Sequence, residues 1–164
     1  MSDPLRIAFV CTGNICRSPL AECLARHHLQ QAGLGGRVVL ESFGTHDYHV
    51  GHGADRRTIA TAHRFGIDVS AHRARCIVAN DCATADLVLA MDRDHERHLR
   101  RLLPVSAGEQ IQRYLPFVGI EDVRDVPDPY DGEAEGFIAV HRLLDRAARR
   151  LAGRVCSLIA DRDG

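Results

Sequence analysis

Apolar residues occur in short runs that are separated by longer stretches of mixed polarity. The runs Leu5–Cys11 and 85–91 are almost continuously apolar, which is typical of strands buried on both faces of a parallel sheet. Residues 37–43 and 110–115 are shorter or more mixed, and we expect a second and a fourth strand there.

A helix is predicted directly after the first strand. Ser18 fits the N-cap, Pro19 the first helical position and Glu22 the first turn. We expect this helix to run to about Gln31 and to stop at Gly33, because glycine accepts the left-handed conformation that ends many helices.

Further helices are expected along the chain. One covers residues 55–65 and another begins at Asp92. A long amphipathic C-terminal helix is predicted by apolar residues spaced three or four positions apart, namely Phe137, Val140, Leu144, Ala147, Leu151, Val155 and Leu158. Strands that alternate with helices predict an α/β fold, a doubly wound parallel sheet with flanking helices. We find no repeat or linker and expect residues 1–164 to form a single domain.

The composition excludes some classes of function. The 164 residues carry a formal net charge of −1, which argues against bulk binding to nucleic acid or to an anionic membrane surface. No apolar run is long enough to cross a membrane, and no segment resembles a signal peptide. The six cysteines are scattered without a CxxC pair, so we expect free thiols in a reducing cytoplasm. Secretion by a route that needs no signal peptide stays open.

The candidate chemistry begins where the first strand ends, in the sequence VCTGNICRS. In doubly wound folds, ligands bind beyond the carboxyl ends of the strands, where the next helix exposes unpaired N–H groups. Gly13 and Asn14 accept backbone torsions closed to most residues, and Arg17 offers two parallel donors to phosphate oxygens. The predicted phosphate-binding residues are Thr12, Gly13, Asn14, Ile15, Cys16, Arg17 and Ser18.

Cys11 stands at the base of this loop and is the predicted nucleophile. A positive field lowers the pKa of a thiol, and Ser18 could donate a hydrogen bond to the thiolate. A thiolate beneath a tetrahedral oxyanion suits attack on phosphorus, with a cysteinyl-phosphate intermediate. A Cys-x5-Arg spacing alone often arises by chance. No G-K-[ST] is present, which excludes a Walker A loop, and the Cys11 to Cys16 spacing argues against zinc.

A candidate general acid lies far downstream, in DVPDPYDG, residues 125–132. Asp128 stands between Pro127 and Pro129, which stiffen the loop. A carboxyl group held at a rigid turn can protonate the oxygen that leaves during phosphoryl transfer. The alternatives are an ordinary Asp-Pro turn, or Asp125 or Asp131 as the acid.

Together the two motifs resemble the low-molecular-weight protein tyrosine phosphatase family, in which the cysteine loop precedes the Asp-Pro-Tyr loop. The stretches SFGTHDYHVG and LVLAMD are also similar to segments of that family. The resemblance implies a four-stranded parallel sheet in flavodoxin-like order, hydrolysis of phosphotyrosine monoesters, and neither a metal nor an organic cofactor. It implies phosphotyrosine proteins or peptides as partners, a bacterial tyrosine kinase among them, and inorganic phosphate as product. We also expect a monomer.

The resemblance assigns roles by matching motif. Cys11 resembles the nucleophile, Arg17 the phosphate clamp, and Asp128 the general acid that later deprotonates the attacking water. The residues that resemble the supporting network are Asn14, Ser18, Ser42 and His72. The residues that resemble the walls around a substrate ring are Ile15, Tyr48 and Tyr130.

Two positions depart from the family pattern. Many members carry a second aromatic residue after Asp-Pro-Tyr, whereas Asp131 stands here, and several have Trp where this chain has Tyr48. Asp131 removes a possible apolar wall and adds negative charge at the mouth of the site. We therefore expect weaker affinity for some anionic phosphopeptides.

Two other functions compete with this interpretation. Thiol-dependent arsenate reduction uses the same fold, but its resolving cysteines are expected after the third strand, and Cys76 and Cys82 precede it. A phosphotyrosine-binding module with a vestigial site is the second alternative. The presence of both Cys11 and Asp128 argues against it.

A histidine-rich loop raises the question of a metal site. His46, His49 and His52 recur every three residues, and imidazole is a common metal ligand. Histidines in loops are more often solvated, and we expect no metal here.

Cys16 is not needed for phosphoryl transfer, yet the curl of the loop should bring it near Cys11. An exposed thiolate is readily oxidised, and a neighbouring thiol can trap the sulfenic acid as a disulfide. We therefore predict reversible inactivation by peroxide through Cys11 and Cys16, which the resemblance also implies. The alternative is that Cys16 only packs within the loop.

Overall fold

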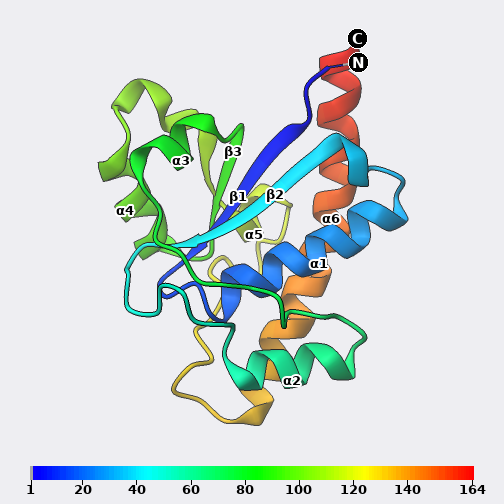
Figure 1. The fold of residues 1–164 in the computed structure, drawn as a ribbon. Helices are drawn as coiled ribbons and strands as arrows, with labels where there is room; N and C mark the ends of the chain where they lie inside the picture. The colour runs from blue at the N-terminus through cyan, green and yellow to red at the C-terminus, as the bar shows by residue number, and fades with distance from the viewer. Residues whose placement is uncertain (1) are drawn as a thin grey trace.

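The strands form one parallel sheet. The computed structural model describes residues 2–164. The strands are Leu5–Cys11 (β1), Val38–Gly44 (β2), Leu87–Ala90 (β3) and Ile111–Arg113 (β4), in the order β2-β1-β3-β4 (Figure 1). This order confirms the predicted doubly wound sheet in flavodoxin-like order. It makes β1 a central strand, with β2 on one side and β3 on the other.

Helices cover both faces of the sheet. They are Arg17–Gln31 (α1), Arg56–Arg64 (α2), Ala79–Thr84 (α3), Arg93–Leu102 (α4), Tyr114–Phe117 (α5) and Ala134–Asp163 (α6), with 3₁₀ turns at Gly35–Arg37 (η1) and Val105–Gln110 (η2). In Figure 1, α1 and α6 lie together on one side of the strands, and α3 and α4 lie on the other. No helix within residues 2–164 is long and apolar enough to span a membrane.

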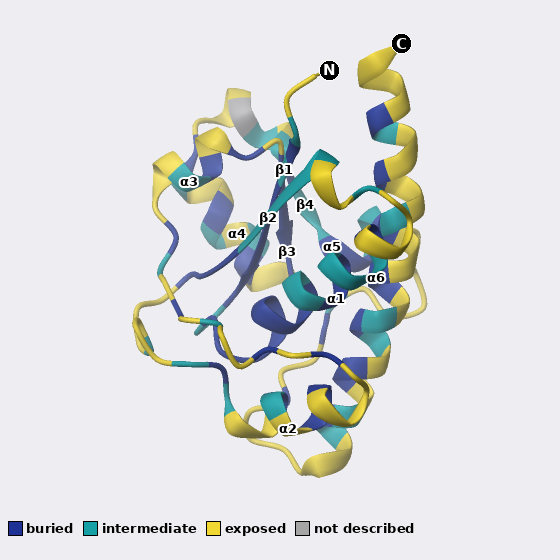
Figure 2. Ribbon diagram, turned by 45° about the vertical axis from the view of Figure 1, so that its right-hand side comes forward, coloured by how far each residue is buried: buried dark blue, intermediate teal, exposed yellow. Residues whose placement is uncertain are grey.

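Side chains of β1 alternate between two apolar cores. Ile7 and Phe9 pack with α1 and α6, whereas Ala8 and Val10 face the core beneath α3 and α4. Burial on both faces explains why this strand is apolar almost throughout, and the centre of the sheet is buried in Figure 2. Cys11 is the last residue of β1, so the strand delivers its thiol to the edge where ligands bind.

The start of α1 differs from the prediction. Its first helical residue is Arg17, and Cys16 occupies the N-cap position without a side-chain cap. Ser18 is therefore not the N-cap, Pro19 is the third helical residue, and Glu22 lies beyond the first turn. The Ser18 hydroxyl is instead drawn into the site described below, and tertiary hydrogen bonds outweigh its capping preference.

Other boundaries follow the predictions more closely. Gly33 has φ = 76° just after α1, as expected for a helix end. Asp55 caps α2 by accepting a hydrogen bond from the Arg57 N–H, and Asp92 caps α4. The fourth strand is shorter than predicted because α5 begins at Tyr114. The short helix α3 was not predicted.

Candidate active site

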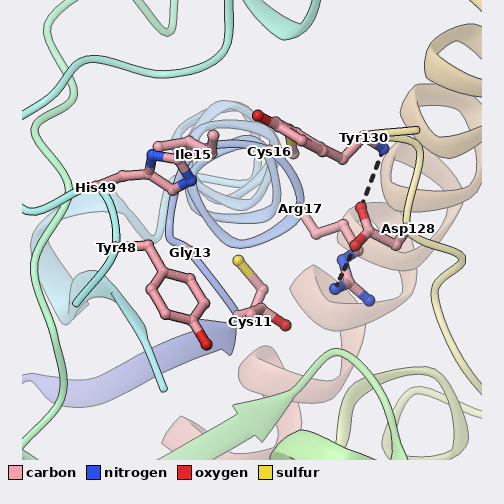
Figure 3. A pocket seen from close by; sticks show the side chains of 10 residues that line it. Cys11, Gly13, Ile15, Cys16, Arg17, Tyr48, His49, Asp128 and Tyr130 are labelled. Atoms are coloured by element: carbon pink, nitrogen blue, oxygen red, sulfur yellow. Dashed lines mark hydrogen bonds and ion pairs between the residues drawn. The ribbon is translucent and has the colours of Figure 1, made fainter. Parts of the chain in front are cut away.

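A pocket opens at the carboxyl end of β1, above the loop that joins β1 to α1. Its volume is about 160 Å³. It is lined by Cys11, Thr12, Gly13, Ile15, Cys16, Arg17, Tyr48, His49, Asp128 and Tyr130. In Figure 3 the Cys11 sulfur lies between Tyr48 on one side and Arg17 with Asp128 on the other. The pocket thus collects the two sequence motifs, which are more than a hundred residues apart.

The loop turns several of its carbonyl groups outward. The Thr12 carbonyl accepts a hydrogen bond from the His46 N–H (3.0 Å), and the Ile15 carbonyl accepts one from the Asp55 N–H (2.8 Å). Within the described part of the chain, the N–H groups of residues 13–16 donate to no other protein group. Outward carbonyls with free amides are the geometry of an anion-binding nest. Phosphate binding by this loop stays a prediction.

Asn14 braces the loop from inside. It is fully buried at φ = 58°, the left-handed region that the sequence predicted it to tolerate. Its Nδ2 donates to Ser18 Oγ (2.8 Å) and Ser42 Oγ (3.1 Å), and its Oδ1 accepts from the Arg75 N–H (3.0 Å). Its carbonyl accepts from His72 Nε2 (2.6 Å), and burial lowers the pKa of His72, favouring the neutral ring. Ser42 and His72 therefore contact Asn14 as expected; the Arg75 contact was not predicted.

Ser18 connects this brace to the thiol. The Ser18 Oγ lies 3.0 Å from Cys11 Sγ and accepts the hydrogen bond from Asn14 Nδ2. Its own proton is therefore available to Cys11, with the Phe43 carbonyl (3.3 Å) as the competing acceptor. A hydroxyl that donates to sulfur stabilises the thiolate over the thiol.

Arg17 is held rigidly on the side of the pocket opposite Tyr48 (Figure 3). Its side chain is buried, and its Nη1 donates to Asp92 Oδ2 (2.9 Å) and to the Val126 carbonyl (3.0 Å). These two bonds fix the plane of the guanidinium. Within residues 2–164, the Nε–H forms no hydrogen bond, and Nη2 has only a 3.5 Å ion pair with Asp128. The Nε–Nη2 edge of Arg17 therefore faces the pocket, where an oxyanion can replace Asp128.

Asp128 faces Arg17 across the mouth of the pocket. Its Oδ2 lies 3.5 Å from Arg17 Nη2, and its Oδ1 accepts a hydrogen bond from the Tyr130 N–H (3.0 Å). Asp125, the competing candidate, forms an ion pair with Arg113 (3.2 Å), and Asp131 does not line the pocket. Of the three carboxyl groups, Asp128 is thus the one that can reach a bound phosphate ester.

The three residues predicted to surround a substrate ring, Ile15, Tyr48 and Tyr130, all line the pocket. Ile15 is buried, whereas Tyr48 and Tyr130 are exposed. His49 also lines the pocket, although the sequence marked it only as a candidate metal ligand. It packs over Gly13 so closely that a Cβ on that glycine would lie 2.8 Å from its ring. A side chain at position 13 would therefore have to displace the His49 ring. Gly13 does not adopt a positive φ, so the unusual backbone conformation expected of it is found at Asn14 alone.

The histidine-rich loop carries no sign of a metal centre. Across residues 2–164, no group of three or more His, Cys, Asp or Glu side chains is arranged to hold a metal ion. The His46 ring instead stacks on Tyr48 at 5.0 Å, and His49 lines the pocket. His49 thus forms part of the rim, and His46 packs against the rim residue Tyr48.

Cys16 stands at the end of the loop and is buried, although it lines the pocket. It packs with Ile15, Ala74 and Phe137, and burial raises the pKa of its thiol to about 12. Cys11 and Cys16 are both free thiols. The packing role is therefore visible, and the redox role of Cys16 stays a prediction.

Cys76 and Cys82 lie away from the pocket. Cys82 is buried in the core beneath α3, and Cys76 contacts the Thr45 carbonyl. Neither residue lines the pocket with Cys11, which argues further against a resolving role in arsenate reduction.

Comparison with known proteins agrees with this geometry. The family model for low molecular weight phosphotyrosine protein phosphatase matches residues 6–161. The chain belongs to this family. The low molecular weight protein-tyrosine-phosphatase of Streptomyces coelicolor is 42% identical over 156 residues, which are 92% of this chain and 93% of that protein. Protein-tyrosine phosphatase A of Mycobacterium tuberculosis is 41% identical over 150 residues, covering 90% and 89% of the two chains.

Solved structures support the same assignment. The crystal structure of a protein tyrosine phosphatase from Entamoeba histolytica superposes with a TM-score of 0.89 at 32% identity, covering 93% of this chain and 97% of that one. The phosphatase fold and the family expected from the two motifs are thereby confirmed.

Several residues around the site were not predicted from the sequence. Asp92 and Val126 hold Arg17, and His95 lies 2.8 Å from Thr12 Oγ1 through its Nε2. Asp92 directly follows the third apolar run, where a doubly wound fold collects ligand-binding groups, so that signal was present. His95 and the Val126 carbonyl had no comparable signal, because nothing local to them marks their neighbours.

Proposed function

We propose that this protein hydrolyses phosphotyrosine monoesters, with Cys11 as nucleophile, Arg17 as phosphate clamp and Asp128 as general acid and base. The observation that carries the proposal is the convergence of these three side chains on one pocket whose rim bears Tyr48 and Tyr130. A thiol, a guanidinium and a carboxyl group around an amide nest are the parts that phosphoryl transfer to sulfur requires.

In the first step, the Cys11 thiolate attacks phosphorus while the loop amides and the free edge of Arg17 hold the phosphoryl oxygens. Asp92 and Val126 keep that edge in place, so little reorganisation is needed as charge develops. A dianionic phosphate competes with Asp128 for Arg17 Nη2 and loosens the 3.5 Å ion pair between them. Asp128 is then free to turn toward the leaving oxygen.

Asp128 acts twice in this scheme. It gives its proton to the departing phenolate, and the resulting carboxylate takes a proton from the water that cleaves the cysteinyl phosphate. Inorganic phosphate is the final product, and no metal or organic cofactor takes part. Ile15, Tyr48 and Tyr130 surround the aromatic ring of the substrate.

Hydrolysis of p-nitrophenyl phosphate tests the nucleophile. Wild-type protein should be active. Cys11→Ser should lose activity by at least 1,000-fold, a rise of about 4 kcal/mol in activation free energy, because a serine hydroxyl at this site has no strong base beside it. Cys156→Ser, at an exposed position on α6, is the matched control and should retain full activity. An inactive wild type that still binds phosphate would favour a binding module, and an active Cys11→Ser would refute the mechanism.

A series of leaving groups tests the acid. Asp128→Ala should slow the release of phenols more steeply as their basicity rises, because a poor leaving group depends most on a proton donor. Asp125→Ala is the matched control, and its activity should show the wild-type dependence on leaving group. If Asp125→Ala instead showed the steeper dependence, the acid would be reassigned.

The proposal also includes expectations about domain organisation, oligomeric state, location and partners. We expect residues 1–164 to act as one domain and as a monomer in the cytoplasm, which sedimentation and cell fractionation can test. Phosphotyrosine proteins, a bacterial tyrosine kinase among them, are the expected partners. Capture of phosphoproteins by Asp128→Ala from lysate, released by vanadate, would identify the substrate, and capture that vanadate leaves intact would count against it.

A further inference from the structure

The N-terminus of α4 holds the phosphate loop at both of its ends. Near the start of the loop, Thr12 Oγ1 lies 2.8 Å from His95 Nε2. At its far end, Arg17 Nη1 donates to Asp92 Oδ2 at 2.9 Å. Asp92 is the N-cap of α4 and His95 is its third residue, so one helix cap contacts both ends of the loop.

The hydrogen bonds around His95 define where its proton lies. Its Nδ1 accepts a hydrogen bond from the Asp92 N–H at 3.2 Å, completing a reciprocal cap. Asp92 Oδ1 also lies 3.1 Å from that nitrogen, but this oxygen already accepts the N–H groups of Asp94 (2.9 Å) and His95 (3.0 Å). The ring is buried, and burial and the charge of Arg17 lower its pKa to about 4. A neutral ring that accepts at Nδ1 carries its proton on Nε2 and donates it to Thr12.

This donation limits the conformation of Thr12. A β-branched side chain has few rotamers, and a buried donor fixed by its own helix cap selects the one that turns the hydroxyl toward α4. Thr12 lines the pocket directly after Cys11, and its carbonyl accepts from the His46 N–H. Its side chain and its backbone are thus anchored to different segments.

We propose that His95 is a positioning residue of this enzyme: through Thr12 and the Asp92 cap, it holds the start of the phosphate loop in register with the guanidinium of Arg17. The inference deepens the proposed function and rests on it. A loop that shifts by a fraction of an ångström separates the thiolate from the phosphorus held by Arg17, and such displacements slow chemistry strongly.

Two substitutions at His95 separate its two hydrogen bonds. The side-chain amide of glutamine reaches about as far as the Nε2 of histidine, so His95→Gln keeps the donor to Thr12. Asparagine reaches only as far as Nδ1, so His95→Asn keeps an acceptor for the Asp92 N–H and loses Thr12. Thr12→Val removes the partner hydroxyl at constant shape.

The experiment measures kcat/KM for p-nitrophenyl phosphate, inhibition by inorganic phosphate, and urea unfolding for each variant. We expect His95→Asn and Thr12→Val to lower kcat/KM about 10-fold, a loss typical of one buried hydrogen bond. His95→Gln should recover most of the activity, and Thr12→Val with His95→Asn should be no worse than either alone. His63→Asn, an exposed histidine of α2, is the control and should behave as wild type.

The outcomes separate this inference from the function beneath it. If wild-type protein fails to hydrolyse the ester, or does so without Cys11, the proposed function fails. If activity depends on Cys11 but the Thr12 and His95 effects are additive, the positioning role is overturned. It is also overturned if His95→Gln is as impaired as His95→Asn, or if activity merely follows the unfolding midpoint.

Discussion

Asn14 allows a quantitative test of how the loop is built. It is fully buried, its φ of 58° lies in the left-handed region, and its carboxamide makes three hydrogen bonds. Asn14→Ala removes the carboxamide and leaves a Cβ in strained backbone. Asn14→Gly removes the same carboxamide and relieves the strain, so the pair separates hydrogen bonding from conformation.

The magnitudes follow from these contacts. Three hydrogen bonds at about 1 kcal/mol each give a loss of about 3 kcal/mol in the free energy of unfolding for both variants. Alanine in the left-handed region costs a further 1–2 kcal/mol or so, whereas the flexibility of glycine costs roughly 0.5–1 kcal/mol. Asn14→Gly should therefore be more stable than Asn14→Ala by up to about 1 kcal/mol, which reverses the usual order.

Urea unfolding and hydrolysis of p-nitrophenyl phosphate measure the two effects. Both variants should lose most of their activity. The hydrogen bond from Asn14 Nδ2 to Ser18 Oγ orients the Ser18 hydroxyl so that its proton points to Cys11, and both variants lack this bond. Asn80 is the matched control: it is exposed within α3, so Asn80→Ala should be more stable than Asn80→Gly. The reasoning is refuted if Asn14 shows the same order as Asn80, and the brace is refuted if both Asn14 variants keep wild-type activity.

Three further predictions concern substrate choice, oxidation and pH. Asp131→Tyr should improve kcat/KM for acidic phosphopeptides relative to neutral ones, and an unchanged ranking would count against a role for that charge. After peroxide treatment and thiol rescue, Cys16→Ser should recover less activity than wild type or Cys156→Ser, because Cys16 lines the same pocket as Cys11 and is placed to trap its sulfenic acid; equal recovery would leave Cys16 as a packing residue. His95 has a pKa of about 4 in the folded protein against an ordinary 6.5, so the unfolded chain binds more protons below pH 6.5. The His95 contribution to the free energy of unfolding should fall by up to about 2 kcal/mol between pH 7 and pH 5. His95→Gln should remove this part of the dependence in urea titrations and leave the part due to other buried histidines such as His72.

The fold could be predicted from the sequence because the patterns that indicate its strands and helices are local. The buried run at β1 and the periodicity of α6 each lie within one segment, and burial on both faces or along one stripe accounts for them. Boundaries were less secure where tertiary contacts compete with local preference. Ser18 has the chemistry of an N-cap, yet its hydroxyl is engaged by Cys11 and Asn14, and α1 begins two residues earlier than predicted.

The sequence by itself determined the reacting groups: a Cys-x5-Arg loop at a strand end and an Asp between prolines define a thiolate, a guanidinium and an acid. Only the tertiary structure decided how they are aimed. Arg17 is oriented by Val126, 109 positions away, and Thr12 is held by His95, 83 positions away. Local backbone preferences reach only a few residues. These two hydrogen bonds depend instead on how the loop after β1 is placed against α4 and against the segment that contains Val126. The reacting groups can therefore be identified from the sequence, whereas their relative orientation is set by the tertiary structure.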